Sequence, residues 1–425
     1  MTNLPPGVGC EGLILPVTIR PHDLPRVGRS GEPDVSPSQE RPLSASRRRT
    51  ARGLRLRVGR AWRLPENMST HAPFVLDANG SAMTGAYDAA EKLDVRTARR
   101  GQARPEGGDM RALVTGGAGF IGSHLVDALV GLGADVVVLD DLSSGRAENV
   151  NPAAHLFQAD ILDKAAVDRA MEGCELAFHQ AARRAVLQSI EQPLDTDRVN
   201  VGGTLTVLMA AKDARVRRVV FGASSSVYGG TAPLPTPEST PPNPRSPYAV
   251  TKYAGEQYCR VFAQLYDVET IALRYFNVYG PRQTPDSRYA AVIPLFIAAL
   301  ASARPPEVHG DGRQSRHFTF VSDAVQANLR AAEASPQCSG RVYNVAGDRA
   351  HTLLEVLEVI EDTLGIRVAP LHTAPRVGDV RHSLADLTAA KRDLDYEPAV
   401  GLHQGLPLTV ESLINQIATR RGARR

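Results

Sequence analysis

The sequence predicts an α/β fold whose parallel sheet is covered by helices on both faces. From residue 110 onward, short apolar runs that indicate strands alternate with segments of helical period, and this alternation is typical of parallel sheets. The run at 135–139 is DVVVL, and its continuous valines suit a strand buried on both sides. A glycine-rich turn joins the first strand to the first helix. The chain from residue 110 is therefore predicted to form a doubly wound sheet.

The individual elements follow from the apolar runs and from apolar residues spaced three and four apart. The first helix is expected to stop at Gly133, a residue type that commonly follows a helix. The predicted strands are 111–115, 135–139, 155–158, 176–179 and 218–221, and the predicted helices are 120–132, 164–171, 201–212 and 248–266.

The composition is that of an ordinary globular protein. The chain has 425 residues, of which 43% are hydrophobic and 22% charged, which is enough for two domains. No stretch approaches 18 consecutive apolar residues, and the N-terminus lacks a charged segment followed by an apolar one, so neither a membrane span nor a secretory signal is predicted. The four cysteines form no C-x-x-C pair, which argues against a zinc knuckle. We expect a cytoplasmic protein without a bound metal.

Residues 1–109 differ from the rest in charge. They hold 17 Lys and Arg against 12 Asp and Glu, a net charge of +5, which leaves −2 for 110–425. The stretch 41–63 carries nine arginines and no acid, a pattern that can also indicate a nucleic-acid or membrane-surface patch. We favour a disordered leader, because a Pro-, Gly-, Ser- and Arg-rich segment with little periodicity cannot bury enough apolar surface. The chain uses 44 Arg against 5 Lys, and Met110 directly precedes the first strand, so an over-long start site is a further interpretation.

The turn after the first strand has the spacing of a phosphate-binding loop. Gly116, Gly119 and Gly122 lie at G-x-x-G-x-x-G spacing between strand and helix, where glycine permits a tight turn and close backbone approach to a pyrophosphate at the helix N-terminus. Asp140 follows at the end of the second strand, where a carboxylate can accept both adenosine ribose hydroxyls and would repel a 2′-phosphate. NAD is therefore expected rather than NADP. Because Asp141 stands beside it, the acid that binds the ribose is either Asp140 or Asp141.

Asp160 and Ile161 come directly after the third predicted strand. They form either a simple strand-end turn or a border of the adenine pocket. The sequence does not decide between the two.

Tyr248 and Lys252 stand four residues apart in SPYAVTK, on what should be one helical face. Ser224 precedes Tyr248 by 24 residues, in a serine-rich segment at the end of a strand. A tyrosine of ordinary pKa about 10 is a poor base at neutral pH, but a nearby ammonium and an oxidised nicotinamide favour phenolate. We expect Tyr248 to be a general base, Lys252 to lower its pKa and hold the nicotinamide ribose, and Ser224 to hydrogen-bond the reacting oxygen.

Four further motifs extend this pattern over the chain, at 274–283 (RYFNVYGPRQ), 289–294 (YAAVIP), 310–323 (GDGRQSRHFTFVSD) and 378–386 (GDVRHSLAD). With the glycine turn and the Ser, Tyr and Lys set, they make 110–425 resemble the extended short-chain dehydrogenase/reductase superfamily, and within it the NAD-dependent nucleotide-sugar 4-epimerases. The last two motifs most resemble the branch acting on UDP-N-acetylated hexoses, the UDP-N-acetylglucosamine 4-epimerases.

The resemblance implies an architecture and an assembly. An NAD-binding Rossmann domain would span about 110–280, and a smaller C-terminal α/β substrate domain would span 281–425, with segments returning to the first. The site would lie in the cleft between them. Two long helices near 201–212 and 248–266 would pair across a homodimer interface, and no nucleic acid or membrane partner is expected.

The resemblance also implies a role for each matching position, and it implies no metal ligand. The catalytic set is Ser224, Tyr248 and Lys252. The implied cofactor-binding residues are Gly116, Gly119, Phe120, Ile121, Gly122, Asp140, Asp160, Ile161, Ala181, Arg184, Asn200, Tyr248, Lys252 and Tyr275. The implied UDP-sugar-binding residues are Ser224, Ser226, Asn277, Ala291, Val292, Arg316, Arg376 and Ser383.

Among these, Asn277 would bind the substrate diphosphate, Arg316 and Arg376 would neutralise it, and the 289–294 segment would line the uridine pocket. Ser383 would gate the end of the sugar pocket, because a large side chain there excludes an N-acetyl group and a serine leaves room. We therefore expect UDP-GlcNAc and UDP-GalNAc to be accepted along with UDP-glucose and UDP-galactose.

Two departures from the family pattern concern sugar specificity. Arg183 and Arg184 place two bulky cations where close relatives have small residues, and Arg184 stands where relatives often have lysine or a small residue. His317 replaces the usual aspartate after Arg316.

The mechanism implied is a reversible oxidation at C4 of the sugar. Tyr248 removes the proton of the 4-hydroxyl while hydride passes from C4 to tightly held NAD. The 4-keto intermediate turns over within the pocket, and hydride returns to its opposite face, so no net cofactor is consumed. A pocket that holds two sugar orientations favours a few adaptable contacts at the ring and strong contacts at the nucleotide.

Three other functions compete with this one. A 4,6-dehydratase or decarboxylase uses the same fold but adds an acidic residue beside the catalytic serine, where this chain has Ser225 and Ser226. UDP-glucuronate 4-epimerisation is closer, and only substrate assays separate it. A non-catalytic NAD-sensing or RNA-binding protein is supported only by the arginine-rich leader, and the intact Ser224, Tyr248 and Lys252 argue against it.

Overall fold

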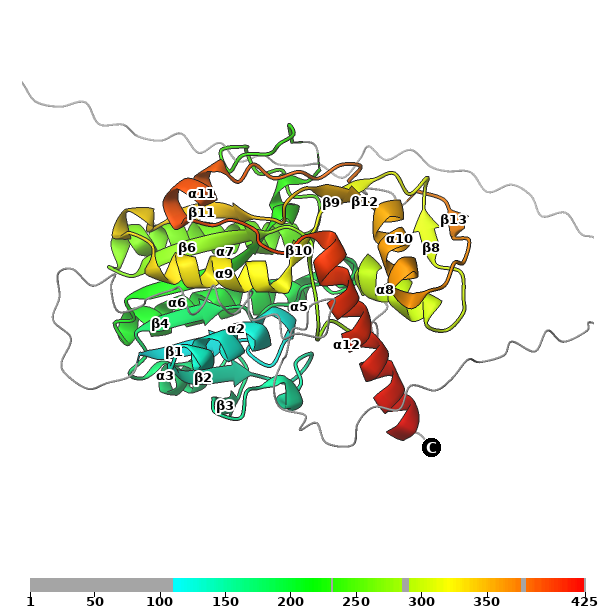
Figure 1. Ribbon diagram of the computed structural model, residues 1–425. Helices are drawn as coiled ribbons and strands as arrows, with labels where there is room; N and C mark the ends of the chain where they lie inside the picture. The colour runs from blue at the N-terminus through cyan, green and yellow to red at the C-terminus, as the bar shows by residue number, and fades with distance from the viewer. Residues whose placement is uncertain (1–109, 231, 285–289, 376–379, 424–425) are drawn as a thin grey trace, which may run out of the picture. The chain divides into compact units, whose positions relative to one another are not determined.

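The computed structural model describes residues 110–230, 232–284, 290–375 and 380–423 (Figure 1). These residues all belong to one compact unit of the chain. The predicted disordered leader, residues 1–109, lies outside the described residues.

Within the described residues, seven parallel strands form the central sheet, in the order β11-β6-β5-β4-β1-β2-β3. The strands are β1 (Arg111–Thr115), β2 (Asp135–Asp140), β3 (His155–Gln158), β4 (Leu176–His179), β5 (Arg218–Ser224), β6 (Glu269–Tyr275) and β11 (Arg341–Val345). The parallel sheet confirms the predicted fold class. Because β1 lies between β2 and β4, the chain changes direction across the sheet there, and ligands of such folds bind beyond the carboxyl ends of the strands at this point.

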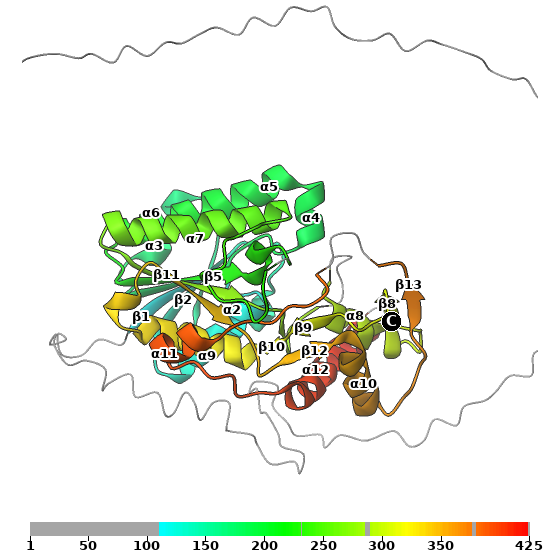
Figure 2. The ribbon, with the colours of Figure 1, turned by 90° about the horizontal axis from the view of Figure 1, so that it is seen from above.

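Helices cover both faces of the sheet (Figure 2). One face carries α2 (Phe120–Gly131), α9 (Val321–Glu333) and α11 (Thr388–Leu394), and the other carries α3 (Lys164–Met171), α6 (Gly203–Asp213) and α7 (Pro247–Leu265). Each layer has its own core, with Leu125, Leu129 and Val325 in the first and Met171 and Phe262 in the second. The inner strands are buried on both sides for this reason, as the run of valines in β2 predicted, whereas the edge strand β3 is largely exposed.

The short elements beside the sheet form a third core. The strand pairs are β7 (Val278–Tyr279) with β10 (Thr319–Phe320), β9 (Ser315–His317) with β12 (Ala350–Thr352), and β8 (Glu307–His309) with β13 (Leu371–Thr373). The helices are α8 (Val292–Leu300), α10 (Leu353–Leu364) and α12 (Leu402–Ala423). Their apolar side chains pack together in a core that includes Phe296, Val356 and Leu406.

Two of the predicted elements differ from the sequence prediction by more than one residue at an end. The strand predicted at 218–221 continues to Ser224, because the small residues Gly222 and Ala223 stay in register with β6. The helix predicted at 201–212 begins as α6 at Gly203, after α4 (Val186–Glu191), α5 (Pro193–Asp197) and a π-helical turn at Arg198–Gly202. A side chain at Gly203 would meet Ile161 at 2.4 Å, so glycine there lets the helix approach the turn after β3.

No helix among the described residues is both long and apolar enough to cross a membrane.

Candidate active site

The glycine turn after β1 forms a cradle that a side chain would fill. Gly116 has φ +71°, and a Cβ there would lie 2.6 Å from the backbone nitrogen of Ala181. A Cβ on Gly122 would lie 2.1 Å from the carbonyl oxygen of Gly116. Glycine is therefore required at both positions, and α2 begins directly beyond the turn at Phe120. A helix N-terminus beside bare backbone is suited to a pyrophosphate.

The acid at the end of β2 faces this turn. Asp140 is buried, its Oδ2 accepts a hydrogen bond from the Ala118 backbone nitrogen at 3.0 Å, and its Oδ1 accepts one from Leu142 at 2.9 Å. Burial raises the pKa of Asp140, and these two N–H donors partly offset the rise. Asp141 instead accepts from the exposed Ser143 in the following loop. Asp140 is thus held against the glycine turn, and the cradle and this carboxylate fit the phosphates and ribose of NAD.

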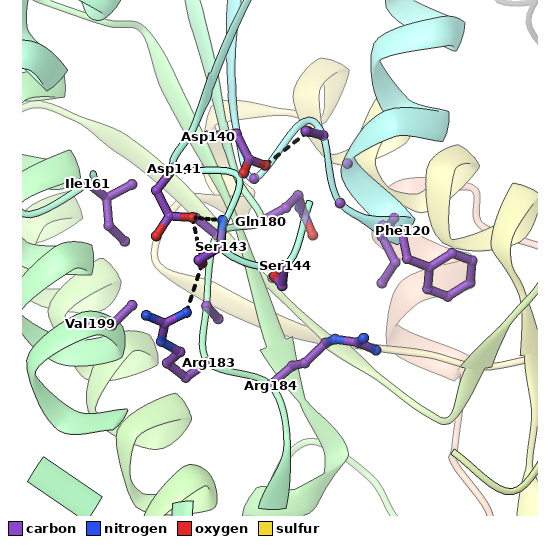
Figure 3. A pocket seen from close by; sticks show the side chains of 18 of the residues that line it. Phe120, Asp140, Asp141, Ser143, Ser144, Ile161, Gln180, Arg183, Arg184 and Val199 are labelled. Atoms are coloured by element: carbon purple, nitrogen blue, oxygen red, sulfur yellow. Dashed lines mark hydrogen bonds between the residues drawn. The ribbon is translucent and has the colours of Figure 1, made fainter. Parts of the chain in front are cut away.

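A first cavity lies at this edge of the sheet (Figure 3). It is lined by most of the predicted cofactor residues, namely Gly116, Gly119, Phe120, Ile121, Gly122, Asp140, Asp160, Ile161, Ala181, Arg184, Tyr248, Lys252 and Tyr275. Asn200 is the exception among them. Its side chain accepts from the Arg183 backbone nitrogen at 2.7 Å and donates to the Arg183 carbonyl oxygen and to Thr251, so it anchors the turn after β4, and its contact with the cofactor stays a prediction.

A second cavity of about 980 Å³ adjoins the first, near the upper end of the range of about 300–1,000 Å³ for small-molecule sites. Its lining includes the predicted substrate residues Ser224, Ser226, Asn277, Ala291, Arg316 and Ser383. Val292 begins α8 and is absent from the described lining of this cavity. Arg376 lies outside the described residues.

Tyr248 lies where the two cavities meet, since it lines both. It stands in the first turn of α7, whose N-cap Ser246 accepts a hydrogen bond from the Ala249 backbone nitrogen at 3.2 Å. Ser224 at the end of β5 hydrogen-bonds its phenol and also accepts from the Ser226 backbone nitrogen at 3.2 Å. The extension of β5 to Ser224 therefore brings the serine to the tyrosine.

Two cations, Arg184 and Lys252, line the first cavity together with Tyr248, and they have different partners. Burial raises the pKa of Tyr248, and the hydrogen bond with Ser224 and the charge of Arg184 oppose the rise. Lys252 donates instead to the Gly222 carbonyl oxygen at 2.7 Å and lies over the Phe221 ring. Burial lowers the pKa of Lys252 to about 8. Helical spacing places Lys252 one turn from Tyr248, but its long side chain crosses to β5.

The wall of the second cavity that carries Ser383 is fixed by β9. The Ser383 backbone nitrogen donates to the Ser315 carbonyl oxygen at 3.1 Å. His317 Nδ1 accepts from the Ala385 backbone nitrogen at 3.1 Å, and its carbonyl oxygen accepts from the Asn277 side chain at 3.1 Å. His317 thus joins the segment of Ser383 to that of Asn277, although it is absent from the described lining of both cavities.

Several lining residues were not predicted. Ser143 and Arg146 follow β2 and line both cavities, as does Arg183, while Arg245 and His382 line the second. The sequence did contain a signal that could have predicted Ser143 as a site residue. It is a polar residue soon after a buried parallel strand, and the loops that follow such strands gather at one sheet edge. Within the described ranges, no group of three or more His, Cys, Asp and Glu is placed to hold a metal ion.

Comparison with known proteins identifies the family. Residues 112–346 match the NAD dependent epimerase/dehydratase family. A UDP-glucose 4-epimerase of Mycolicibacterium smegmatis is 41% identical over 314 residues, which cover 72% of this chain and 99% of the relative.

Two solved structures are similar over the same share of the chain. The UDP-glucose 4-epimerase of Thermotoga maritima, solved with UDP-glucose, has a TM-score of 0.70 and 38% identity, covering 72% of this chain and 100% of that one. The UDP-N-acetylglucosamine 4-epimerase of Methanobrevibacter ruminantium, solved with UDP-N-acetylmuramic acid, has a TM-score of 0.69 and 37% identity, covering 72% and 99%. The chain belongs to the NAD dependent epimerase/dehydratase family.

Proposed function

We propose that this chain is an NAD-dependent UDP-sugar 4-epimerase with Tyr248 as its base. The observation that carries the proposal is that Tyr248 lines both the cavity at the glycine turn and a second, larger cavity, which Ser224 also lines. A base at this junction touches both the cofactor and the sugar, which proton removal coupled to oxidation at one carbon requires.

The residues of the first cavity would hold NAD. The cradle at Gly116 and Gly122 would receive the pyrophosphate, and Asp140 would accept the ribose hydroxyls. Lys252 and Tyr275 would lie at the nicotinamide end, with Tyr275 fixed by a hydrogen bond from Asn328 at 2.8 Å. When bound, NAD supplies reversible two-electron oxidation of a carbinol carbon.

Tyr248 and Ser224 would handle the proton at the sugar 4-oxygen. Tyr248 Oη accepts the proton of the 4-hydroxyl on oxidation and gives it back on reduction. Ser224 Oγ holds the same oxygen in hydrogen-bond reach, and the charge of Arg184 favours the phenolate that accepts the proton. Because the proton returns to the same substrate, the chain needs no outlet for it.

Strong contacts at the nucleotide would anchor the substrate while the ring changes orientation. Asn277 and Arg316 line the second cavity and would bind the diphosphate, together with Arg376. Ala291 would contact the uridine with Val292, which begins α8 beside it. The small side chains of Ser224 and Ser226 leave the ring few fixed contacts. This division between firm and adaptable contacts suits an epimerase.

Ser383 supports the proposal that N-acetylated sugars are accepted. It lines the second cavity beside His382 and Leu384, and its short side chain leaves volume at that wall. We propose turnover of UDP-GlcNAc and UDP-GalNAc as well as UDP-glucose and UDP-galactose.

UDP-glucuronate is the second candidate substrate, and the charge of the cavity favours it. The described lining of the second cavity includes Arg184, Arg245 and Arg316 and contains no Asp or Glu. A carboxylate on the sugar would therefore meet no repulsion from the described lining. The same absence of a lining acid disfavours a dehydratase, which needs one beside Ser224.

We also propose a homodimer, with α7 at its interface. Val250, Val261 and Leu265 of this helix are 50%, 40% and 69% exposed, and large apolar side chains gathered on one helix are typical of a covered face. Light scattering of the purified chain tests this, and a monomer at micromolar concentration would contradict it.

The function is tested by incubating the full chain with UDP-glucose, UDP-GlcNAc or UDP-glucuronate, without added NAD, and separating the 4-epimers. Formation of the epimer of at least one substrate is expected, together with NAD released on denaturation. A chain that carries no dinucleotide and forms no epimer after NAD is added would overturn the proposal.

A further inference from the structure

A continuous chain of hydrogen bonds links the loop after β2 to α5. Arg183 donates through Nη1 to Ser143 Oγ at 2.8 Å and through Nε to Asp195 Oδ2 at 3.2 Å. Ser143 Oγ in turn donates to Asp141 Oδ1 at 2.6 Å. The dashed lines in Figure 3 follow the part from Arg183 through Ser143 to Asp141. One arginine side chain thus joins two segments that are 40 residues apart in sequence.

The position of this link follows from the strand order. Ser143 follows β2, Arg183 follows β4, and β1 lies between those two strands. A bond between the two loops therefore spans the carboxyl end of β1, where the glycine turn of Gly116 begins. Ser143 and Arg183 both line the first cavity, as does Gly116. The link therefore lies at the same sheet edge as the glycine turn, within the lining of the first cavity.

The arginine is held at its base as well as at its tip. Its backbone nitrogen donates to Asn200 Oδ1 at 2.7 Å, and its carbonyl oxygen accepts from Asn200 Nδ2 at 3.0 Å. Asn200 also donates to Thr251 of α7 at 3.0 Å. The backbone of Arg183 is therefore fixed, while only its side chain, 27% exposed, needs to move to open the link.

We propose that Arg183 is a positioning residue that straps the dinucleotide into the first cavity and so sets how slowly NAD leaves. The proposal rests on the NAD binding of the proposed function, but not on the identity of the sugar. A cofactor that is regenerated within each catalytic cycle must stay bound through that cycle. A side chain that closes over it by two hydrogen bonds slows release without adding a contact to the reacting atoms.

The chain offers variants that separate a strap from a charge. Arg183→Ala removes the link and keeps the backbone bonds to Asn200. Ser143→Ala removes the hydroxyl that accepts the Arg183 hydrogen bond and leaves the positive charge of Arg183 in place. Arg198→Ala is the matched control, because Arg198 also pairs with Asp195, at 3.2 Å, but is 66% exposed and is absent from the described lining of both cavities.

The experiment measures the release of NAD rather than turnover. Each full-length variant is loaded with radiolabelled NAD⁺ and chased with an excess of unlabelled NAD⁺, and the label that stays with the protein after desalting is followed in time. Circular dichroism confirms that each variant is folded. We expect Arg183→Ala and Ser143→Ala each to release NAD⁺ about tenfold faster than wild type, the effect of losing one charge-assisted hydrogen bond, and Arg198→Ala to match wild type.

The outcomes distinguish the strap from the proposed function. Wild-type release from Arg183→Ala overturns the strap, and so does fast release from Arg183→Ala with wild-type release from Ser143→Ala, because the charge alone would then hold the ligand. Fast release from Arg198→Ala overturns the strap as well, since a general loss of structure around α5 would then explain the result. If wild type itself retains no label, the proposed function fails instead.

Discussion

Arg184 and Tyr248 act on each other through their charges. Burial raises the pKa of the Tyr248 phenol, and the hydrogen bond with Ser224 and the positive charge of Arg184 oppose the rise. Burial lowers the pKa of the Arg184 guanidinium, and Tyr248 raises it. Arg184 lines both cavities and points away from Arg183 in Figure 3, so the two neighbouring arginines have different tasks.

Arg184→Ala should shift the rising limb of the pH–rate profile to higher pH. Loss of the cation leaves the burial of Tyr248 less opposed, so its pKa rises and less phenolate is present at neutral pH. Activity lost at pH 7 should return at alkaline pH, and Arg184→Lys should restore the wild-type profile. Steady-state rates from pH 6 to 10 measure this. Arg245→Ala is the control, because Arg245 lines the second cavity but does not act on Tyr248. An unchanged limb in Arg184→Ala would contradict the assignment.

Tyr248→Phe should lower kcat by about 10²- to 10⁴-fold, the usual contribution of a general base. The variant keeps the ring and should still carry NAD, which release on denaturation measures. Tyr253→Phe, on the same helix and absent from the described lining of both cavities, should keep wild-type activity. Turnover near wild type in Tyr248→Phe would remove the base from the mechanism.

The elements that the sequence predicted well are those with strong local signals. β1, β3 and β4 have the predicted bounds, because short runs with an apolar centre between turn segments leave little choice. The glycine turn was equally clear from its spacing in the sequence. In the structure, Gly116 and Gly122 indeed have no room for a Cβ. The pairs of short strands beside the sheet were not predicted, because strands such as β9 and β12, of three residues each, are too short for periodicity.

Most of the predicted site residues line the two cavities, but the sequence did not predict which residues contact one another there. Helical spacing put Tyr248 and Lys252 on one face, yet it could not show that Lys252 reaches across to Gly222. Arg184 acts on Tyr248 from a loop 64 residues earlier, and Asn200 binds the backbone of Arg183. Such contacts depend on the packing of distant segments, which a single sequence does not encode in any local pattern.

Acid should destabilise the fold through buried neutral histidines. Burial is the main cause that lowers the pKa of His317 and of His124 to about 4, and that of His179 to about 3. The unfolded chain binds these protons near pH 6.5, so the stability is complete above that pH and is lost as the pH falls toward about 4. For His317 alone the loss is about 3 kcal/mol.

The measurement is the free energy of unfolding in urea at pH 7 and pH 4.5. His317→Asn keeps an acceptor for the Ala385 backbone nitrogen but does not titrate, so its stability should fall less between the two pH values than that of wild type. The exposed His403→Asn is the control and should fall as wild type does. A pH dependence of His317→Asn equal to that of wild type would show that His317 is not buried and neutral.

Ser383→Tyr should separate N-acetylated from plain hexoses. The tyrosine would occupy the space that an N-acetyl group needs, and an overlap of this kind costs about 1–3 kcal/mol, so turnover of UDP-GlcNAc should fall roughly 10- to 100-fold, while that of UDP-glucose stays within a few-fold. Ser383→Ala keeps the space and should leave the ratio unchanged. Equal loss of both substrates in Ser383→Tyr would show that the wall at Ser383 does not gate the sugar.

A buried ion pair joins α7 to β6. Arg274 donates through Nε to Glu256 Oε1 at 2.9 Å and through Nη2 to Oε2 at 2.8 Å, with side chains 4% and 0% exposed. Glu256 lies one turn beyond Lys252 on α7, and Arg274 precedes Tyr275. Arg274→Met should lower the free energy of unfolding by about 3–5 kcal/mol, because it leaves the carboxylate buried without its partner. Arg274→Met with Glu256→Leu should recover much of that loss in urea unfolding. A double variant as unstable as the single one would mean that packing volume, rather than the unpaired charge, accounts for the effect.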